Sequence, residues 1–185
     1  EEQNWEKLID VVTRLADFVD DAKQRAKYMH TAATIARRQV KNLDQAIEFF
    51  ERALKFDPGV AKAAEELVEL YREKGDHVHV ERMLKSQLDA AKDAADRGAI
   101  VRILDELGRL YHEHLNEPEL AIDAFEAAQA FDPDDKTRGE RLAELYASDP
   151  AQYLDKAVRA QSQILRKNPY RVESYKLLRK LFTDS

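Results

Sequence analysis

Two similar thirteen-residue segments occur in the chain, AIEFFERALKFDP at residues 46–58 and AIDAFEAAQAFDP at residues 121–133. The second copy lies 75 positions after the first, and the two share alanine, isoleucine, phenylalanine, aspartate and proline at the same spacing. The match continues beyond these segments, because the same shift aligns ELVELY at 66–71 with RLAELY at 141–146. Most of the sequence therefore consists of two similar copies, and the fold must be one that accepts repeated units.

A shorter period lies within the long one. Similar apolar patterns end at Ala36, Tyr71, Tyr111, Tyr146 and Phe182, at separations of 35, 40, 35 and 36 residues. A period of about 20–50 residues is typical of solenoids, in which each unit packs only against its neighbours. We therefore expect a series of stacked units.

Each unit is expected to contain two helices. In LVELY (67–71) and LGRLY (107–111), apolar residues recur at i, i+3 and i+4, and no segment alternates with period two. Short connections predict antiparallel neighbours in one continuous domain spanning 1–185. The ten predicted helices cover residues 3–19, 22–41, 43–56, 60–74, 77–95, 98–115, 118–130, 136–147, 151–167 and 171–182.

Turn residues predict where these helices begin and end. Proline suits the first helical position, where its missing N–H would have no partner, and four of the five residues that precede a proline are good N-caps. Gly75 and Asp76 predict a further turn, with glycine ending one helix and aspartate starting the next. The prolines that we expect to begin helices are Pro58, Pro118, Pro133, Pro150 and Pro169.

Composition and charge limit the classes of function. The formal net charge is −6, so a phosphate backbone would be repelled on average, and nucleic acid is not an expected partner. There is no run of about 18 apolar residues of the kind that spans a membrane. The sequence has no cysteine, which removes disulfides, thiolate metal ligands and cysteine nucleophiles together.

Patterns for catalysis and metal binding are also missing from the sequence. It contains no glycine-rich phosphate loop, no GxSxG motif and no HExxH motif. His77 and His79 are two positions apart, as are His112 and His114, and residues at i and i+2 of a helix do not share a face. We interpret these histidines as surface residues, and we expect no enzymatic activity, no cofactor and no metal site.

At Leu107-Gly108-x2-Tyr111, followed by Ala121-x3-Phe125, Ala128 and Pro133, the sequence resembles the tetratricopeptide repeat family. Weaker copies of these marks end at Tyr71, Tyr146 and Phe182. The resemblance implies an all-α fold, a right-handed superhelix (solenoid) of antiparallel helix pairs. It divides the chain into four full repeats flanked by half repeats, with bounds 1–20, 21–58, 59–96, 97–133, 134–169 and 170–185.

The resemblance also implies where a partner would bind. In this family, ligands lie in a concave groove lined by the first helix of each repeat, at positions nine, six and two residues before the tyrosine mark and one after it. Four rows follow: Lys27, Lys62, Arg102 and Thr137; His30, Glu65, Asp105 and Glu140; Thr34, Glu69, Arg109 and Glu144; and Arg37, Arg72, His112 and Ala147. Stripes of opposite charge would suit an extended peptide or helix of mixed charge. Alternatively, i, i+3 pairs such as Lys62 with Glu65, Arg102 with Asp105, and Glu69 with Arg72 neutralise one another.

The leading interpretation is a non-catalytic scaffold that binds a protein or peptide in this groove. One alternative is an architectural segment that self-associates through its end helices, and another is a regulatory array of a larger protein whose catalytic part lies outside this chain. The end helices motivate both alternatives. At the N-terminal end, Trp5, Leu8, Val12 and Leu15 resemble the second helix of a repeat without its first. At the other end, Phe182 ends a first helix without its second. We expect a longer array, or another chain, to cover these faces.

Overall fold

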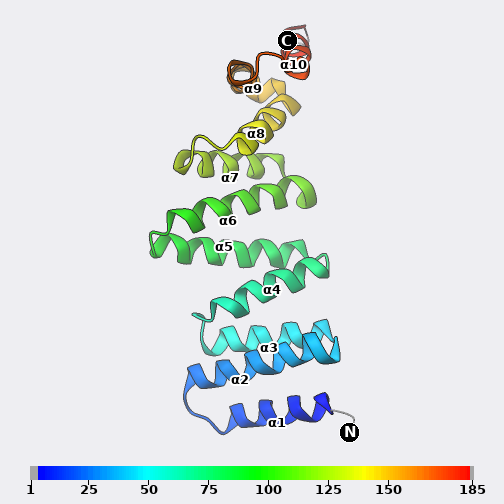
Figure 1. The fold of residues 1–185 in the computed structure, drawn as a ribbon, viewed down its shortest axis with the longest axis vertical. Coiled ribbons are helices and arrows are strands. Elements are labelled where there is room, and N and C mark those ends of the chain that lie inside the picture. Colours follow the sequence, from blue (N-terminus) through cyan, green and yellow to red (C-terminus); the bar gives the residue numbers. More distant parts are fainter. Residues whose placement is uncertain (1–3, 184–185) are drawn as a thin grey trace. The chain divides into compact units, whose positions relative to one another are not determined.

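The computed structural model describes residues 4–183, and these residues form ten α-helices and no strand (Figure 1). Two π-helical turns, η1 (Ala36–Val40) and η2 (Tyr111–Leu115), continue the second and sixth helices. The all-α fold and the order of helices predicted from the sequence are confirmed. The helices are α1 (Trp5–Asp17), α2 (Ala22–Ile35), α3 (Leu43–Phe56), α4 (Ala61–Glu73), α5 (His77–Asp93), α6 (Arg97–Leu110), α7 (Pro118–Phe131), α8 (Lys136–Ser148), α9 (Pro150–Lys167) and α10 (Val172–Thr183).

The chain divides into two compact units, Glu1–Met83 and Leu84–Ser185, and the division falls within α5. In the first unit, α1 packs on α2, α2 on α3, and α3 on α4. In the second unit, α6 packs on α7, α7 on α8, α8 on α9, and α9 on α10. Each unit therefore has the predicted packing of consecutive helices, while the union of both in one continuous domain stays a prediction.

Helices α6 and α7 approach each other closely at Gly108. A Cβ atom at this position would lie 2.6 Å from Cε1 of Phe125, whose side chain is only 2% exposed. The phenylalanine ring therefore occupies the space that any side chain at position 108 would need. One long period earlier, Ala33 and Phe50 occupy the equivalent positions of the first unit and are 0% and 1% exposed.

The repeated segment supplies the core of both helix pairs. Its alanines let the helix backbones approach, and one phenylalanine of each copy, Phe50 or Phe125, fills the space between the helices. These residues are at most 2% exposed, and they are Ala46, Phe50 and Ala53 in α3 and Ala121, Phe125 and Ala128 in α7. The segment is repeated because one helix pair cannot bury its apolar side chains alone, and each further pair must bury a similar apolar face against its neighbours.

The prediction that every proline begins a helix is wrong for three of the five. Pro118 and Pro150 are the first residues of α7 and α9, as predicted. The others lie in the turns after α3, α7 and α9, and they are Pro58, Pro133 and Pro169. The residue before each of these three has φ of −143°, −138° or −138°, with ψ between 84° and 99°. Proline disfavours the helical conformation at its predecessor, and at these three positions the next helix begins three residues after the proline.

The turn predicted at Gly75 and Asp76 is confirmed. Gly75 has φ of 69°, and its N–H donates to the carbonyl oxygen of Arg72 at 3.0 Å. The Asp76 carboxylate then accepts a hydrogen bond from the N–H of His79 at 3.2 Å and caps α5. Glycine ends α4 here because the left-handed conformation costs it little.

Both end helices leave apolar side chains exposed. In α1, Val12 is buried in the first unit, whereas Leu8 and Leu15 are 40% and 43% exposed. In α10, Tyr175 and Phe182 are 53% and 66% exposed. The expectation that further repeats or another chain cover these faces stays a prediction.

Two glycines allow a matched test of the helix packing. A Cβ atom at Gly108 would meet the Phe125 ring, whereas a Cβ atom at Gly139 in α8 would have no atom within 4 Å. We expect Gly108→Ala to lower the free energy of unfolding by about 1–3 kcal/mol through overpacking. We expect Gly139→Ala to raise it by about 1 kcal/mol, because alanine favours the helix. Urea denaturation followed by circular dichroism measures both changes, and changes of the same sign would contradict this account of the packing.

Candidate functional site

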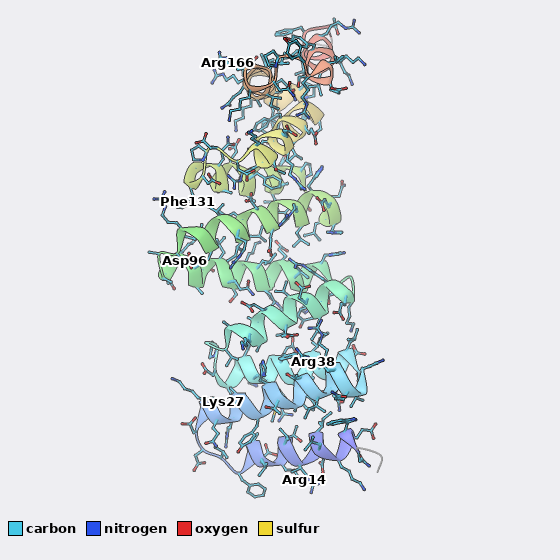
Figure 2. The ribbon with its side chains drawn as sticks, viewed as in Figure 1. Arg14, Lys27, Arg38, Asp96, Phe131 and Arg166 are labelled. Carbon is cyan, nitrogen blue, oxygen red and sulfur yellow. The ribbon has the colours of Figure 1, made fainter. Side chains whose placement is uncertain are left out.

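The predicted groove residues lie on the first helices of the repeats. The first unit carries eight of them on α2, η1 and α4, and the second carries eight on α6, η2 and α8. Figure 2 labels Lys27 in the first half of α2 and Arg38 in the middle of η1. Within each unit the structure places residues from neighbouring first helices near one another, and their contacts decide which remain available to a partner.

In the first unit, Arg37 is engaged between repeats. Its guanidinium donates hydrogen bonds to the carboxylates of Glu66 and Glu73, which both belong to α4. The Arg37 side chain is only 22% exposed. The hydroxyl of Thr34 also stays within the protein and donates to the carbonyl oxygen of His30 at 2.8 Å. Arg37 therefore joins η1 to α4.

His30 lies partly buried beside the core. Its ring meets the ring of Phe50 edge-on, with 5.3 Å between the centroids and 75° between the planes. Burial lowers the pKa of His30, the charges of Lys62 and Arg38 lower it further, and the charge of Glu66 opposes the shift. His30 therefore presents a neutral imidazole at pH 7.

In the second unit, Asp105 forms a two-pronged ion pair with Arg138. The distances from Arg138 Nε and Nη2 to the two carboxylate oxygens are 2.7 and 2.8 Å. The Arg138 side chain is 2% exposed, and its Nη1 also donates to the carbonyl oxygen of Asp132 at 2.5 Å. Hydrogen bonding to Asp105 raises the pKa of Arg138. Asp105 therefore joins α6 to α8.

The sequence analysis did not predict the role of Arg138, although a comparison of the two long-period copies could have indicated it. One long period earlier, its position is held by Ala63, which is fully buried. A charged residue in place of a buried alanine must find a partner, because an unpaired charge in such a position is costly. The second unit therefore adds an ion pair where the first has a small apolar residue.

Two more acidic groove residues are also engaged. Glu140 accepts a hydrogen bond from Arg171 Nη1 at 2.5 Å, and Glu69 accepts one from Arg72 Nη1 at 2.7 Å. The second contact is one of the i, i+3 pairs that the alternative interpretation predicted. The pair of Arg102 with Asp105 does not form, because Arg138 occupies both oxygens of that carboxylate.

The remaining charged groove residues have exposed side chains. Within residues 4–183 they form no ion pair, and they are mostly basic. This set, which we call the unpaired groove residues, comprises Lys27, Lys62, Glu65, Arg102, Arg109, His112 and Glu144. Thr137 is exposed as well, and Ala147 is half-buried. In the second unit, the two acidic residues of the second predicted row, Asp105 and Glu140, are therefore paired with arginines. Most basic residues of the predicted rows form no ion pair in the described part of the chain.

A small hollow lies beside Arg109 in the second unit. Its volume is about 160 Å³, and the predicted groove residues Asp105, Arg109 and Thr137 line it together with Phe125 and Arg138. This volume is below the range of about 300–1,000 Å³ that is typical of small-molecule sites. The hollow suits one side chain of a longer ligand.

The described part of the chain offers neither a metal cluster nor a membrane-spanning helix. In residues 4–183, no three histidine, aspartate or glutamate side chains come together in a way that could hold a metal ion. None of the helices described combines the length and the apolar character needed to cross a bilayer.

Comparison with protein families identifies the repeats. Residues 26–59 and 101–135 both match the family model described as tetratricopeptide repeat. These segments cover most of α2 with α3, and of α6 with α7. These two segments therefore match tetratricopeptide repeats, as the sequence motifs indicated, and they are the two long-period copies. No curated protein sequence matches the chain.

Solved structures share the fold at low sequence identity. One is YrrB, described as a TPR protein with an unusual peptide-binding site, with 16% identity and a TM-score of 0.55 over 98% of this chain and 83% of that one. Another is the MamA RS-1 ArsTM double mutant, with 15% identity and a TM-score of 0.52 over 98% of this chain and 87% of that one. These similarities establish a helical-repeat fold.

The ion pair of Asp105 can be tested by removing one charge. Asp105→Asn keeps the side-chain shape but removes the two-pronged carboxylate of the buried Arg138 guanidinium, which keeps only the Asp132 carboxylate at 3.7 Å. We expect the free energy of unfolding to fall by about 3 kcal/mol, as for other broken buried pairs. The control is Asp134→Asn, at an exposed position, which should change it by less than about 0.5 kcal/mol. Equal effects of the two variants in chemical denaturation would show that the pair contributes nothing to stability.

The lowered pKa of His30 predicts a pH dependence. Because the folded-state pKa lies below the ordinary value of 6.5, protons bind the unfolded chain more strongly, and stability is lost as the pH falls below about 6.5. His30→Asn should therefore lose less stability than the parent chain between pH 7.0 and pH 5.5, as measured by urea midpoints. His112→Asn, at an exposed position, should keep the parent slope. If His30→Asn lost as much stability as the parent chain over this pH range, the lowered pKa of His30 would be contradicted.

Proposed function

We propose that this chain is a non-catalytic scaffold that binds a segment of another protein along the first helices of its repeats. Tetratricopeptide repeats support a role in protein interaction. Stacked helical repeats create extended surfaces that suit an elongated partner, and such surfaces need no catalytic residues. The peptide-binding site named for YrrB supports the use of a similar fold for this purpose.

The observation that carries the proposal is the division of the groove charges into engaged and unpaired sets. Arg37, Asp105 and Glu140 each pair with a residue of the next repeat, which explains their presence without a ligand. Arg102 and Arg109 have no such partner within residues 4–183, although both lie on α6 with exposed side chains. Charges of this kind set the orientation and association rate of a charged partner.

The geometry around α6 indicates what the partner segment carries. Arg102 and Arg109 favour carboxylates, while Glu144 on α8 favours a basic group, so the segment has mixed charge with an acidic majority. The hollow beside Arg109 accepts one side chain of this segment. Binding of this kind combines a few side-chain anchors with electrostatic alignment.

A charge-reversal experiment tests the groove. Peptides that bind the full chain are selected from a random twelve-residue display library, and their Kd values are measured by fluorescence anisotropy. We expect Arg102→Glu with Arg109→Glu to weaken most selected peptides by about tenfold or more, since two attractive contacts become repulsive. Asp105 is left unchanged, because its loss would disturb the fold itself.

The matched control is Lys55→Glu with Arg166→Glu, which makes the same change in net charge at exposed positions on the second helices α3 and α9. Arg166 is labelled in Figure 2. We expect this control to change the Kd values by less than about twofold. Equal weakening by both double variants, or by neither, would overturn the assignment of the partner to the first helices.

A further inference from the structure

A second and larger hollow lies in the second unit, between the end of α7, the helix α8 and the helix α9. Its volume is about 570 Å³, which falls within the range typical of ligand sites. We call it the α8–α9 cleft. It shares only Asp135 with the small hollow beside Arg109, and Glu140 is its one residue from the predicted groove. The cleft is therefore distinct from the surface assigned above.

Two small residues contribute to the space in the cleft. Gly139 of α8 and Ala160 of α9 both line it, and a Cβ atom at Gly139 would have no neighbour within 4 Å. Larger side chains at these two positions would occupy part of the hollow.

A change of direction in α9 accompanies this opening. Tyr153 has φ of −120° and ψ of 19°, which is not helical, although it lies inside the helix. Figure 1 shows α9 nearly end-on, whereas α7 lies across the view. The two helices therefore diverge, and a divergence at this point leaves the side chains of α8 between them accessible.

Part of the cleft lining is apolar, beside polar residues such as Gln129, Gln163 and Asn168. Leu142 and Tyr146 of α8 line it and are 2% and 7% exposed, so they belong to the fixed core of the unit. Ile164 of α9 lines it from the other side. An apolar side chain placed between Gly139 and Ala160 would contact these residues and leave water.

Most charges around the cleft that lack an ion-pair partner are positive. Lys136, Arg159 and Lys167 line it and form no ion pair within residues 4–183. Of the lining acids, Glu140 pairs with Arg171 at 2.5 Å, and Asp135 caps α8 by accepting the backbone N–H of Arg138 at 2.7 Å. A cationic rim on a chain of net charge −6 selects an acidic ligand.

The spacing of the cations favours a chain of carboxylates over a single one. Arg159 and Lys167 are eight residues apart on α9, which corresponds to about 12 Å along the helix axis. One small carboxylate cannot contact both, whereas successive acidic residues of a peptide can. We propose that the α8–α9 cleft binds an acidic segment of a partner protein, with one large apolar side chain seated between Gly139 and Ala160.

Two synthetic peptides test this proposal on the full chain. The first is a fluorescein-labelled twelve-residue peptide of aspartate and glutamate with one central phenylalanine, and the second has serine in place of the phenylalanine. We expect the phenylalanine peptide to bind about tenfold more tightly than the serine peptide in fluorescence anisotropy titrations. Absence of binding up to about 1 mM, or equal binding of the two peptides, would overturn the proposal.

Variants of the cleft provide the structural control. Gly139→Leu fills the hollow and should abolish the preference for the phenylalanine peptide without lowering the melting temperature, because position 139 has free space. Ala160→Phe places a large side chain in the lining and serves the same purpose if Gly139→Leu does not fold. Arg159→Glu should weaken both peptides about tenfold, whereas Arg166→Glu, outside the lining, should not.

The groove variant separates this proposal from the proposed function. Arg102→Glu with Arg109→Glu should leave binding of the phenylalanine peptide unchanged, since neither residue lines the cleft. If that variant abolishes binding while Gly139→Leu does not, the acidic peptide occupies the groove, and the cleft proposal fails. If the cleft variants alone abolish binding, the cleft is confirmed whatever the library peptides show for the groove.

Discussion

The contact of Phe125 with Gly108 is the interaction on which the rest of the structure depends. A large side chain on one helix occupies the space left by the missing side chain on the other, and this sets the distance between α6 and α7. The first unit repeats the arrangement with Phe50 and Ala33 at the equivalent positions, both buried. In the second unit, the small residues Gly139 and Ala160 line the α8–α9 cleft, where a hollow remains. The pairing of a large with a small side chain thus accounts for the packed core of α6 and α7, and small residues line the hollow between α8 and α9.

Electrostatic contacts then join consecutive repeats and decide which charges are left for partners. The pair of Asp105 with Arg138 crosses from α6 to α8, and the contact of Arg37 with Glu66 crosses from η1 to α4. Since the contacts between repeats use much of the acidic row, the available groove charges become mostly basic. The predicted groove residues carry both charges in the sequence, but those left unpaired in the folded protein are mostly basic, and this difference is the basis for proposing an acidic partner segment.

The helices and the core are predictable from the sequence, because both follow from local spacing. The spacing of alanine and phenylalanine in residues 46–58 and 121–133 is enough to identify the side chains that are buried between the helices. The ion pairs are harder to predict, because Asp105 and Arg138 are 33 residues apart and meet only when their helices pack. The prediction for Pro133 is wrong because proline both starts and stops helices, and the residue before it is non-helical in both cases, with φ of −138° before Pro133 and −128° before Pro150. No sequence motif predicts the α8–α9 cleft, because its lining comes from three helices that meet only in the fold.

The central claim is that partners bind through charges that the repeats do not use among themselves. Hydrogen–deuterium exchange of the full chain, with and without a library-selected peptide, tests this claim most directly. The account predicts slower exchange in α6 and α8, around Arg102 and Arg109, because a bound segment shields these helices and damps their local opening. Protection confined to α1 and α10, where Leu8 and Tyr175 expose apolar side chains, would contradict the account and assign binding to the end helices instead.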